Sequence, residues 1–148
     1  MRSRHADRQR AIAVLYEADL RGDDVSVVVA RTTDDDPLAP FTATLVEGVA
    51  HQQAELDGLI VRYARGWNLD RMPVVDRNLL RLGLWELLHS DVPVAVVIDE
   101  AVELANELST PDSGRFINGV LAAVAREEAD VAAARGSAPT HGGGATSL

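Results

Sequence analysis

Four arginines near the N-terminus are the first residues of this sequence with an evident chemical use. Arg2, Arg4, Arg8 and Arg10 fall within the first ten residues, and only Asp7 opposes their charge there. Guanidinium groups pair with phosphates and carboxylates through parallel hydrogen bonds. The sequence therefore predicts a basic pole that binds an anion, and a solvated basic terminus is the simpler alternative.

A second anion-binding group is expected at residues 114–121, which read GRFINGVL. Asn118-Gly119 between apolar residues is typical of a β-hairpin, but the strong helix-forming sequence that follows places it inside a helix. Arg115 and Asn118 then share one helix face, and free N–H groups at a helix start attract anions. Phe116 could stack on a base, with core packing as the alternative. At Gly119 we expect tight packing against another helix.

No catalytic or metal-binding arrangement is recognisable in the sequence. The histidines His5, His51, His89 and His141 are far apart and lack metal-ligand spacing. There is no Gly-rich phosphate loop and no GxSxG nucleophile motif. The carboxylates at 99–103 are expected to be solvated charges. We therefore predict no enzyme, no metal and no cofactor.

The composition limits which partners this protein can bind. The 148 residues carry a net charge of −9, all 14 basic residues are Arg, and there is no Cys. Negative charge argues against non-specific coating of nucleic acid, because positive charge supplies that affinity. Without Cys there is no disulfide framework and no thiol nucleophile. No apolar run approaches the ~18 residues of a membrane span and no secretory signal is recognisable, so we expect a cytoplasmic protein.

Helices must position the candidate residues, because apolar residues recur at three- and four-residue steps along most of the chain. The pattern predicts an all-α domain over residues 1–135 and, from composition, a disordered tail over 136–148. Asp112 or Ser113 is the expected N-cap of the last helix. The expected helices are 8–20, 25–30, 41–64, 74–89, 95–109 and 115–134.

Two of these helices carry charges whose placement depends on the fold. Extending the apolar stripe of the first helix backwards puts Arg4 and Arg8 on its core-facing line. Because two guanidinium groups cannot be buried unpaired, we expect this end to overhang the core or to fray. In the fourth expected helix, Arg77, Arg81 and Glu86 are expected to face water.

Three segments together resemble the NusB family of transcription antitermination factors. They are the Arg-rich start running into AIAVLYEADL, the run VDRNLLRLGLWELLHSDVPVAVVIDEAVELANEL, and DSGRFINGVL. The F-[IV]-N-G-[VL]-L block and the R-x-x-LWELL…DVP…[ID]EA-x-x-LA run are specific in combination. The resemblance covers residues 4–128, and the all-Arg, Ala- and Asp-rich composition is similar to actinobacterial members.

The resemblance implies an all-α fold of about six to seven helices in two small subdomains, with a long third helix at their junction. It also implies binding of the boxA element of ribosomal-RNA leader transcripts, jointly with the small ribosomal protein NusE. The complex would load onto RNA polymerase, so that the polymerase reads through terminators. The RNA contacts implied by the matching positions are Arg4, Arg8, Arg10, Phe116 and Asn118, and Arg115 joins them by position.

The acidic body of the protein would attract a basic ribosomal protein, so Glu86 and neighbouring acids are the expected partner contacts. The sequence also departs from the family pattern at two places. Ala122 and Ala123 follow GVL where several relatives carry charged or polar residues, and only three residues precede Arg4. The first departure should remove possible RNA or partner contacts at this edge, and the second should make the basic arm bind RNA less firmly.

Two alternative functions stay open at this point. One is a helical protein-interaction module without RNA affinity, which charge reversal at Arg4 and Arg8 would separate from an RNA-binding protein. The other is a fragment or subunit related to the N-terminal domain of ribosomal-RNA cytosine methyltransferases, which binding of S-adenosylmethionine would indicate. The sequence does not choose between a monomer and a homodimer.

Overall fold

The computed structural model describes residues 3–32 and 36–128, and these residues form helices and connecting turns. The all-α prediction is thereby confirmed. The expected tail at 136–148 and the end of the last expected helix lie outside the described residues. The helices are α1 (Arg4–Arg21), α2 (Val25–Ala30), α3 (Pro40–His51), α4 (Gln53–Tyr63), α5 (Val74–His89), α6 (Val94–Leu108) and α7 (Pro111–Glu127), with a 3-10 turn η1 (Leu69–Arg71).

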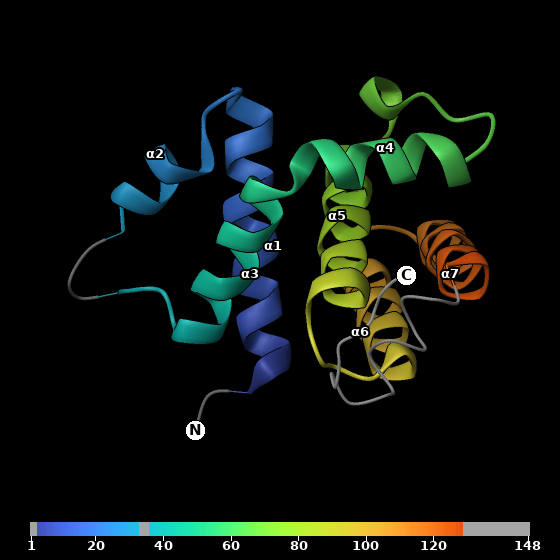
Figure 1. Cartoon of the computed structure of the whole chain (residues 1–148). Coiled ribbons are helices and arrows are strands. Elements are labelled where there is room, and N and C mark those ends of the chain that lie inside the picture. The colour runs from blue at the N-terminus through green and yellow to red at the C-terminus, as the bar shows by residue number, and fades with distance from the viewer. Residues whose placement is uncertain (1–2, 33–35, 129–148) are drawn as a thin grey trace, which may run out of the picture.

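Two groups of helices make up the molecule, as the resemblance implied. Helices α1, α2 and α3 pack together on one side, and α4, α6 and α7 pack around α5 on the other (Figure 1). Helices α1 and α3 also contact α5, so α5 lies at the junction of the two groups. Within the described part of the chain, no helix is long and apolar enough to cross a membrane.

Helix α5 is buried on almost every side because both groups pack against it. Leu80 and Leu84 are completely buried, and the charged residues Arg81 and Glu86 are only 6% and 2% exposed. Arg77 is also mostly buried, with 15% of its side chain exposed. The expectation that these three charged side chains face water is therefore wrong, since a helix at the junction has no free face for them.

The single helix expected over 41–64 is in fact two helices, α3 and α4, that meet at Gln52. The backbone of Gln52 departs from helical geometry, with φ −108° and ψ 15°, and the two helices run in different directions (Figure 1). Helix α3 packs on α1 and α5 and buries Leu45 and Val49, whereas α4 packs on α5 and α7 and buries Leu56. One straight helix could not reach both surfaces, and the helix at the junction is α5 rather than the third helix.

Helix α7 begins one turn earlier than the sequence predicted. Thr110 is its N-cap and accepts a hydrogen bond from the Ser113 N–H through Oγ1 at 3.1 Å, and Pro111 occupies the first helical position. The expected caps, Asp112 and Ser113, therefore lie inside the first turn. Consequently the residues from Arg115 onward lie beyond the free N–H groups of the helix start, which are confined to the first turn.

Candidate nucleic-acid interface

Arg4 is the first residue of α1 and is exposed to solvent. Ser3 caps the helix, since its Oγ accepts a hydrogen bond from the Ala6 N–H at 3.0 Å. The guanidinium carbon of Arg4 lies 4.2 Å from the centre of the Phe41 ring, a cation–π contact that orients the side chain over α3. Arg4 forms no ion pair with any residue in the described ranges, so its charge is available to an external anion.

Arg8 is instead buried between α1 and α5, with only 4% of the residue exposed. Its Nε and Nη2 each donate a hydrogen bond of 2.8 Å to Glu86, one to each carboxylate oxygen. Its Nη1 donates a longer bond of 3.3 Å to Glu100. The expectation that this end of α1 overhangs the core or frays is wrong at Arg8, because a buried guanidinium is tolerated once it is paired.

Glu86, the acid expected to contact a protein partner, is the other half of this buried ion pair. Its side chain is 2% exposed and Arg8 occupies both of its carboxylate oxygens. Burial alone lowers the pKa of Arg8, but the hydrogen bonds and charges of Glu86 and Glu100 outweigh burial and raise that pKa overall. Arg8 therefore stays charged, and the pair connects α1 to α5 without presenting either side chain at the surface.

Arg10 lies on the side of α1 that faces the connection between α2 and α3. Its Nη1 lies 3.1 Å from a carboxylate oxygen of Asp36, and the two side chains are 29% and 68% exposed. An exposed pair of this kind contributes at most about 1 kcal/mol. An incoming phosphate could therefore replace Asp36 at little cost in stability.

His5 connects the start of α1 to α6, a contact that the sequence did not suggest. Its Nδ1 lies 3.1 Å from Glu100 and 3.3 Å from Glu103, and its Nε2 lies 3.0 Å from Glu107. The hydrogen bond with Glu100 is the main reason that the pKa of His5 is raised above its ordinary value of 6.5. Glu100 is 23% exposed, so the expectation of solvated carboxylates on this helix is wrong for Glu100.

The same cluster has the ligand types of a divalent metal site. One ligand atom each from His5, Glu103 and Glu107 lie within 4.8 Å of one another. Imidazole nitrogen and carboxylate oxygen are ordinary ligands for zinc and related ions. A protonated His5 satisfies the same carboxylates without a metal.

The exposed face of α7 carries the second predicted group. The side chain of Arg115 is 74% exposed and pairs with Asp112 one turn earlier. Asn118 is exposed, and its amide forms no hydrogen bond with a residue that the structure describes. The shared face of Arg115 and Asn118 is therefore confirmed. Phe116 is half-buried, packed against the core on one side and against the ring of Trp67 on the other, with 5.2 Å between ring centres.

Gly119 lies on the same exposed side of α7, and the tight packing expected there is absent. A Cβ added at Gly119 would meet none of the described atoms within 4 Å. The close approach is at Gly114, where an added Cβ would lie 2.6 Å from the side-chain oxygen of Asn106. The position of Asn-Gly inside a helix is confirmed. Gly119 destabilises this helix by about 1 kcal/mol relative to Ala, and no internal packing at Gly119 compensates for that loss.

A second buried arginine, Arg81, belongs to a charge network between α1, α4 and α5. Its Nε donates to Asp57 at 2.7 Å and its Nη1 donates to Asp19 at 3.0 Å. Asp19 also accepts two bonds of 2.6 Å from Arg77 and one of 2.9 Å from Asn78. Although burial raises the pKa of Asp19, these bonds lower it overall.

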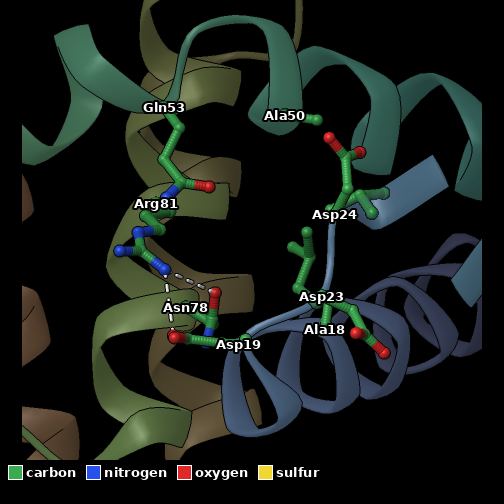
Figure 2. Close-up of a pocket in the computed structure, with 11 residues that line it drawn as sticks. Ala18, Asp19, Asp23, Asp24, Ala50, Gln53, Asn78 and Arg81 are labelled. Atoms are coloured by element: carbon green, nitrogen blue, oxygen red, sulfur yellow. Dashed lines mark hydrogen bonds and ion pairs between the residues drawn. The ribbon is translucent and has the colours of Figure 1, made fainter. Parts of the chain in front are cut away.

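This network lies in the wall of the cavity shown in Figure 2. The cavity has a volume of about 550 Å³ and lies between the end of α1, the α3–α4 junction and α5. Arg81 points toward Asp19 and Asn78, so its charge is directed at residues of the wall. The arginine here holds helices together and is not a free site for an anion.

The predicted residues thus separate into a buried pair and two surface groups. No hydrogen bond, ion pair or ring contact joins the two surface groups among the residues described. Helix α6 connects them, because Glu107 pairs with α1 and the helix leads directly into α7. The buried pair is Arg8 and Glu86, and the surface groups are Arg4 and Arg10 on α1 and Arg115, Phe116 and Asn118 on α7.

Trp67 is an exposed aromatic residue that sequence reasoning missed, because it lies in the connection between the helices expected over 41–64 and 74–89. Its indole is 52% exposed and covers one side of Phe116. The pattern that could have identified it is RYARGW, in which aromatic residues alternate with arginines. Aromatic rings interleaved with basic residues are typical of surfaces that bind single-stranded nucleic acid.

Known proteins match this chain along most of its length. Residues 5–126 match the NusB family model. The transcription antitermination protein NusB of Saccharopolyspora erythraea is 55% identical over 130 residues, which is 84% of this chain and 88% of that protein. The protein of the same name from Streptomyces griseus is 52% identical over 130 residues, covering 82% of this chain and 91% of the relative.

Solved structures have the same fold. The structure of T. maritima NusB matches with a TM-score of 0.76 and 34% identity, over 85% of this chain and 92% of that one. A crystal structure of the antitermination factors NusB and NusE in complex with dsRNA matches with a TM-score of 0.69 and 32% identity, over 84% of this chain and 96% of that one. On sequence and on fold alike, this chain belongs to the NusB family.

Proposed function

We propose that this protein is a transcription antitermination factor that binds the boxA element of ribosomal-RNA leader transcripts together with ribosomal protein NusE. The observation that carries the proposal is the family match over residues 5–126. It is supported by the related structure in which NusB and NusE are bound to dsRNA. In this function the protein works by binding, without a catalytic centre, and acts in the cytoplasm as part of the RNA polymerase antitermination complex.

The RNA contacts are best assigned to side chains that are exposed and either unpaired or weakly paired. Arg4 and Arg10 on α1 and Arg115 on α7 offer guanidinium groups to phosphates. Asn118 offers an amide, whose donor and acceptor can pair with the edge of an unstacked base. Phe116 contributes the exposed part of its ring to the same surface.

Arg8 and Glu86 have a different role in this proposal. Both are buried and bonded to each other at 2.8 Å, so reaching RNA or a partner would require breaking that pair. Arg8 therefore acts as a positioning residue that fixes α1, and with α1 the exposed Arg4 and Arg10. The acids that attract NusE must be sought on the surface rather than at Glu86.

The acidic charge of the protein fits selective binding. With a net charge of −9, the protein as a whole repels nucleic acid, so affinity depends on the few places where arginines are exposed. Salt should weaken this binding, with a slope set by the number of phosphates contacted. The same charge favours association with a basic ribosomal protein.

Fluorescence anisotropy of labelled boxA RNA tests the proposal. We expect binding that is tighter than to a scrambled RNA and that improves when NusE is added. The double variant Arg115→Ala/Asn118→Ala should weaken boxA binding about tenfold, because it removes one phosphate contact and one base contact. Arg21→Ala, at the far end of α1, is a matched control that should bind as wild type.

One result would contradict this function, and a second would change only the residues assigned to its RNA site. Equal, weak binding of boxA and scrambled RNA, unchanged by NusE, would leave a helical protein-interaction module. Full affinity in the Arg115→Ala/Asn118→Ala variant would retain the function but remove the α7 face from the RNA site.

A further inference from the structure

The last turn of α4 and the connection from α4 to α5 carry three arginines without ion-pair partners among the described residues. Arg62, Arg65 and Arg71 are exposed, and none forms an ion pair with a residue in the described ranges. Asp70 is the only acid between residues 61 and 75, so this segment has a charge of +2 in a chain of net charge −9. Most other arginines of the described chain are matched with a carboxylate, which makes this excess a local property of the turn.

Trp67 projects from the tip of this turn, and the backbone around it is well anchored. Gly66 adopts a φ of +82°, which reverses the chain after α4, and the Trp67 N–H donates to the Ala64 carbonyl oxygen at 3.1 Å. Ala64 before the tip and Met72 after it are each 3% exposed and are packed in the core. The indole is therefore presented to solvent from a fixed base, which lowers the entropy lost when it binds something.

The indole does not stand alone, because it extends the exposed face of α7. Its ring lies 5.2 Å from that of Phe116 at an angle of 47°, and we call these two rings the aromatic platform. Gly119 lies one helical turn after Phe116 and leaves open space beside the platform. Arg115 and Asn118 lie on the same helix, so the platform continues the surface already assigned to RNA.

We infer that Trp67 stacks on an unpaired base of the bound RNA while Arg65 and Arg71 pair with its phosphates. This inference rests on the proposed function and extends the RNA site from α7 to the α4–α5 turn. Aromatic rings bordered by arginines are the combination that binds single strands, because rings stack on bases and guanidinium groups pair with phosphates. The segment that carries Trp67 is cationic, with three arginines against one aspartate, which favours a polyanion over an apolar protein surface.

Trp67→Ala tests the stacking contact. It should weaken binding of fluorescein-labelled boxA RNA roughly tenfold, the loss typical of removing one base–aromatic stack. Trp67→Phe should keep most of the affinity, because a smaller ring still stacks. Val27→Ala, which trims an exposed apolar residue on the distant helix α2, should bind as wild type. Circular dichroism and the free energy of unfolding of each variant show whether it is folded in the assay.

Tryptophan fluorescence gives a second readout that a merely structural role would not change. Binding of unlabelled boxA RNA should quench the wild-type emission, because a stacked base quenches an indole. Trp85 is packed against α3 at Gly48 and should contribute little to this change. In Trp67→Phe the quenching should disappear although affinity remains.

The arginines are tested by the salt dependence of RNA binding. Arg65→Ala/Arg71→Ala should weaken binding and reduce the slope of log affinity against log salt by about 0.7 for each lost phosphate contact. Arg21→Ala, again the matched control, should leave the slope unchanged. RNAs with single abasic sites then locate the stacked base, since one site should remove the difference between wild type and Trp67→Ala.

The outcomes separate this inference from the proposed function. If Trp67→Ala binds boxA as wild type while Arg115→Ala/Asn118→Ala is weakened, the platform is not an RNA contact and the function stands. If wild type binds no boxA RNA even with NusE, the function fails and this inference fails with it. If Trp67→Ala loses affinity for NusE but not for RNA, the platform is a protein contact, which also overturns the inference.

Discussion

The junction between the two helical groups and the outer surface around α7 use the same residue type in opposite ways. At the junction, Arg8 is buried and gives two hydrogen bonds of 2.8 Å to Glu86. On the outer surface, Arg65 and Arg71 are exposed and unpaired with any residue described. A buried guanidinium requires a carboxylate, because an uncompensated charge in the interior costs several kcal/mol.

The comparison shows that an arginine-rich segment is not by itself a binding site. Arg4, Arg8 and Arg10 lie within seven residues of one helix, yet one is buried in an ion pair and two are accessible. The side of the helix decides the difference, since Arg8 points at α5 whereas its neighbours do not. Substitutions at the two regions should therefore separate into effects on stability and effects on binding.

The largest expected effect is at the junction. Arg8→Ala should lower the free energy of unfolding by about 3–5 kcal/mol, because it leaves the buried carboxyl group of Glu86 without its partner. Urea denaturation measures this change. The double variant Arg8→Met/Glu86→Leu should recover most of the loss, and Arg10→Ala should lose less than about 1 kcal/mol as an exposed pair. A stable Arg8→Ala protein that fails to bind RNA would remove the distinction between the two regions.

The packing at the junction should also be sensitive to a single methyl group. Gly48→Ala should lower the free energy of unfolding by about 1–3 kcal/mol, because the added Cβ would overlap the indole of Trp85. Thermal or urea unfolding measures the change. Gly58→Ala is the matched control on the exposed side of α4, where an added Cβ meets no described atom within 4 Å, and it should not destabilise. Equal effects at the two glycines would argue against this close contact.

On the outer surface the same kind of substitution should act in the opposite direction. Gly119→Ala should raise the free energy of unfolding by up to about 1 kcal/mol, since Ala favours a helix and has open space there. The shift in the midpoint of urea unfolding reports it. A destabilised Gly119→Ala variant would contradict the open space beside Gly119.

The smallest effect is a pH dependence at the edge of the junction. The hydrogen bond with Glu100 raises the pKa of His5 above 6.5, so folding favours the protonated imidazole. The protonated imidazole of His5 therefore makes its full contribution to the free energy of unfolding below pH 6.5. That contribution is lost as the pH rises through the higher pKa of the folded state. We expect this contribution to stay below about 1 kcal/mol because the carboxylates are partly exposed. Urea unfolding from pH 5 to 9 should show the slope, and His5→Gln should abolish it.

Apolar periodicity predicted the helices well, because alternation of core and surface positions is a local property of each segment. It failed where burial depends on distant elements. Arg8 and Glu86 are separated by 78 positions, so no local pattern revealed that they pair. The break at Gln52 was missed because no Gly or Pro marks it, and the direction change follows from the surfaces that α3 and α4 cover.

The candidate site was predicted in part for the same reason. The shared face of Arg115 and Asn118 follows from helix geometry alone and is present in the structure. The contact between Trp67 and Phe116 joins a turn to a helix 49 residues later, which only the fold brings together. Only the structure shows that Gly119 is exposed with open space beside it, since the same Asn-Gly sequence is compatible with tight packing or with an exposed surface.

The Arg8–Glu86 pair has a consequence for how such sequences can change over generations. Replacing either residue alone leaves a buried group without its partner. The resulting penalty is a large fraction of the free energy of unfolding of a whole domain, which is typically about 5–15 kcal/mol. Lysine does not rescue the arginine position, because it lacks the planar fork that matches both carboxylate oxygens. Mutational paths through this pair should therefore require coordinated replacement, so the two positions are expected to vary together among descendants, whereas an exposed arginine can be replaced singly with little loss of stability.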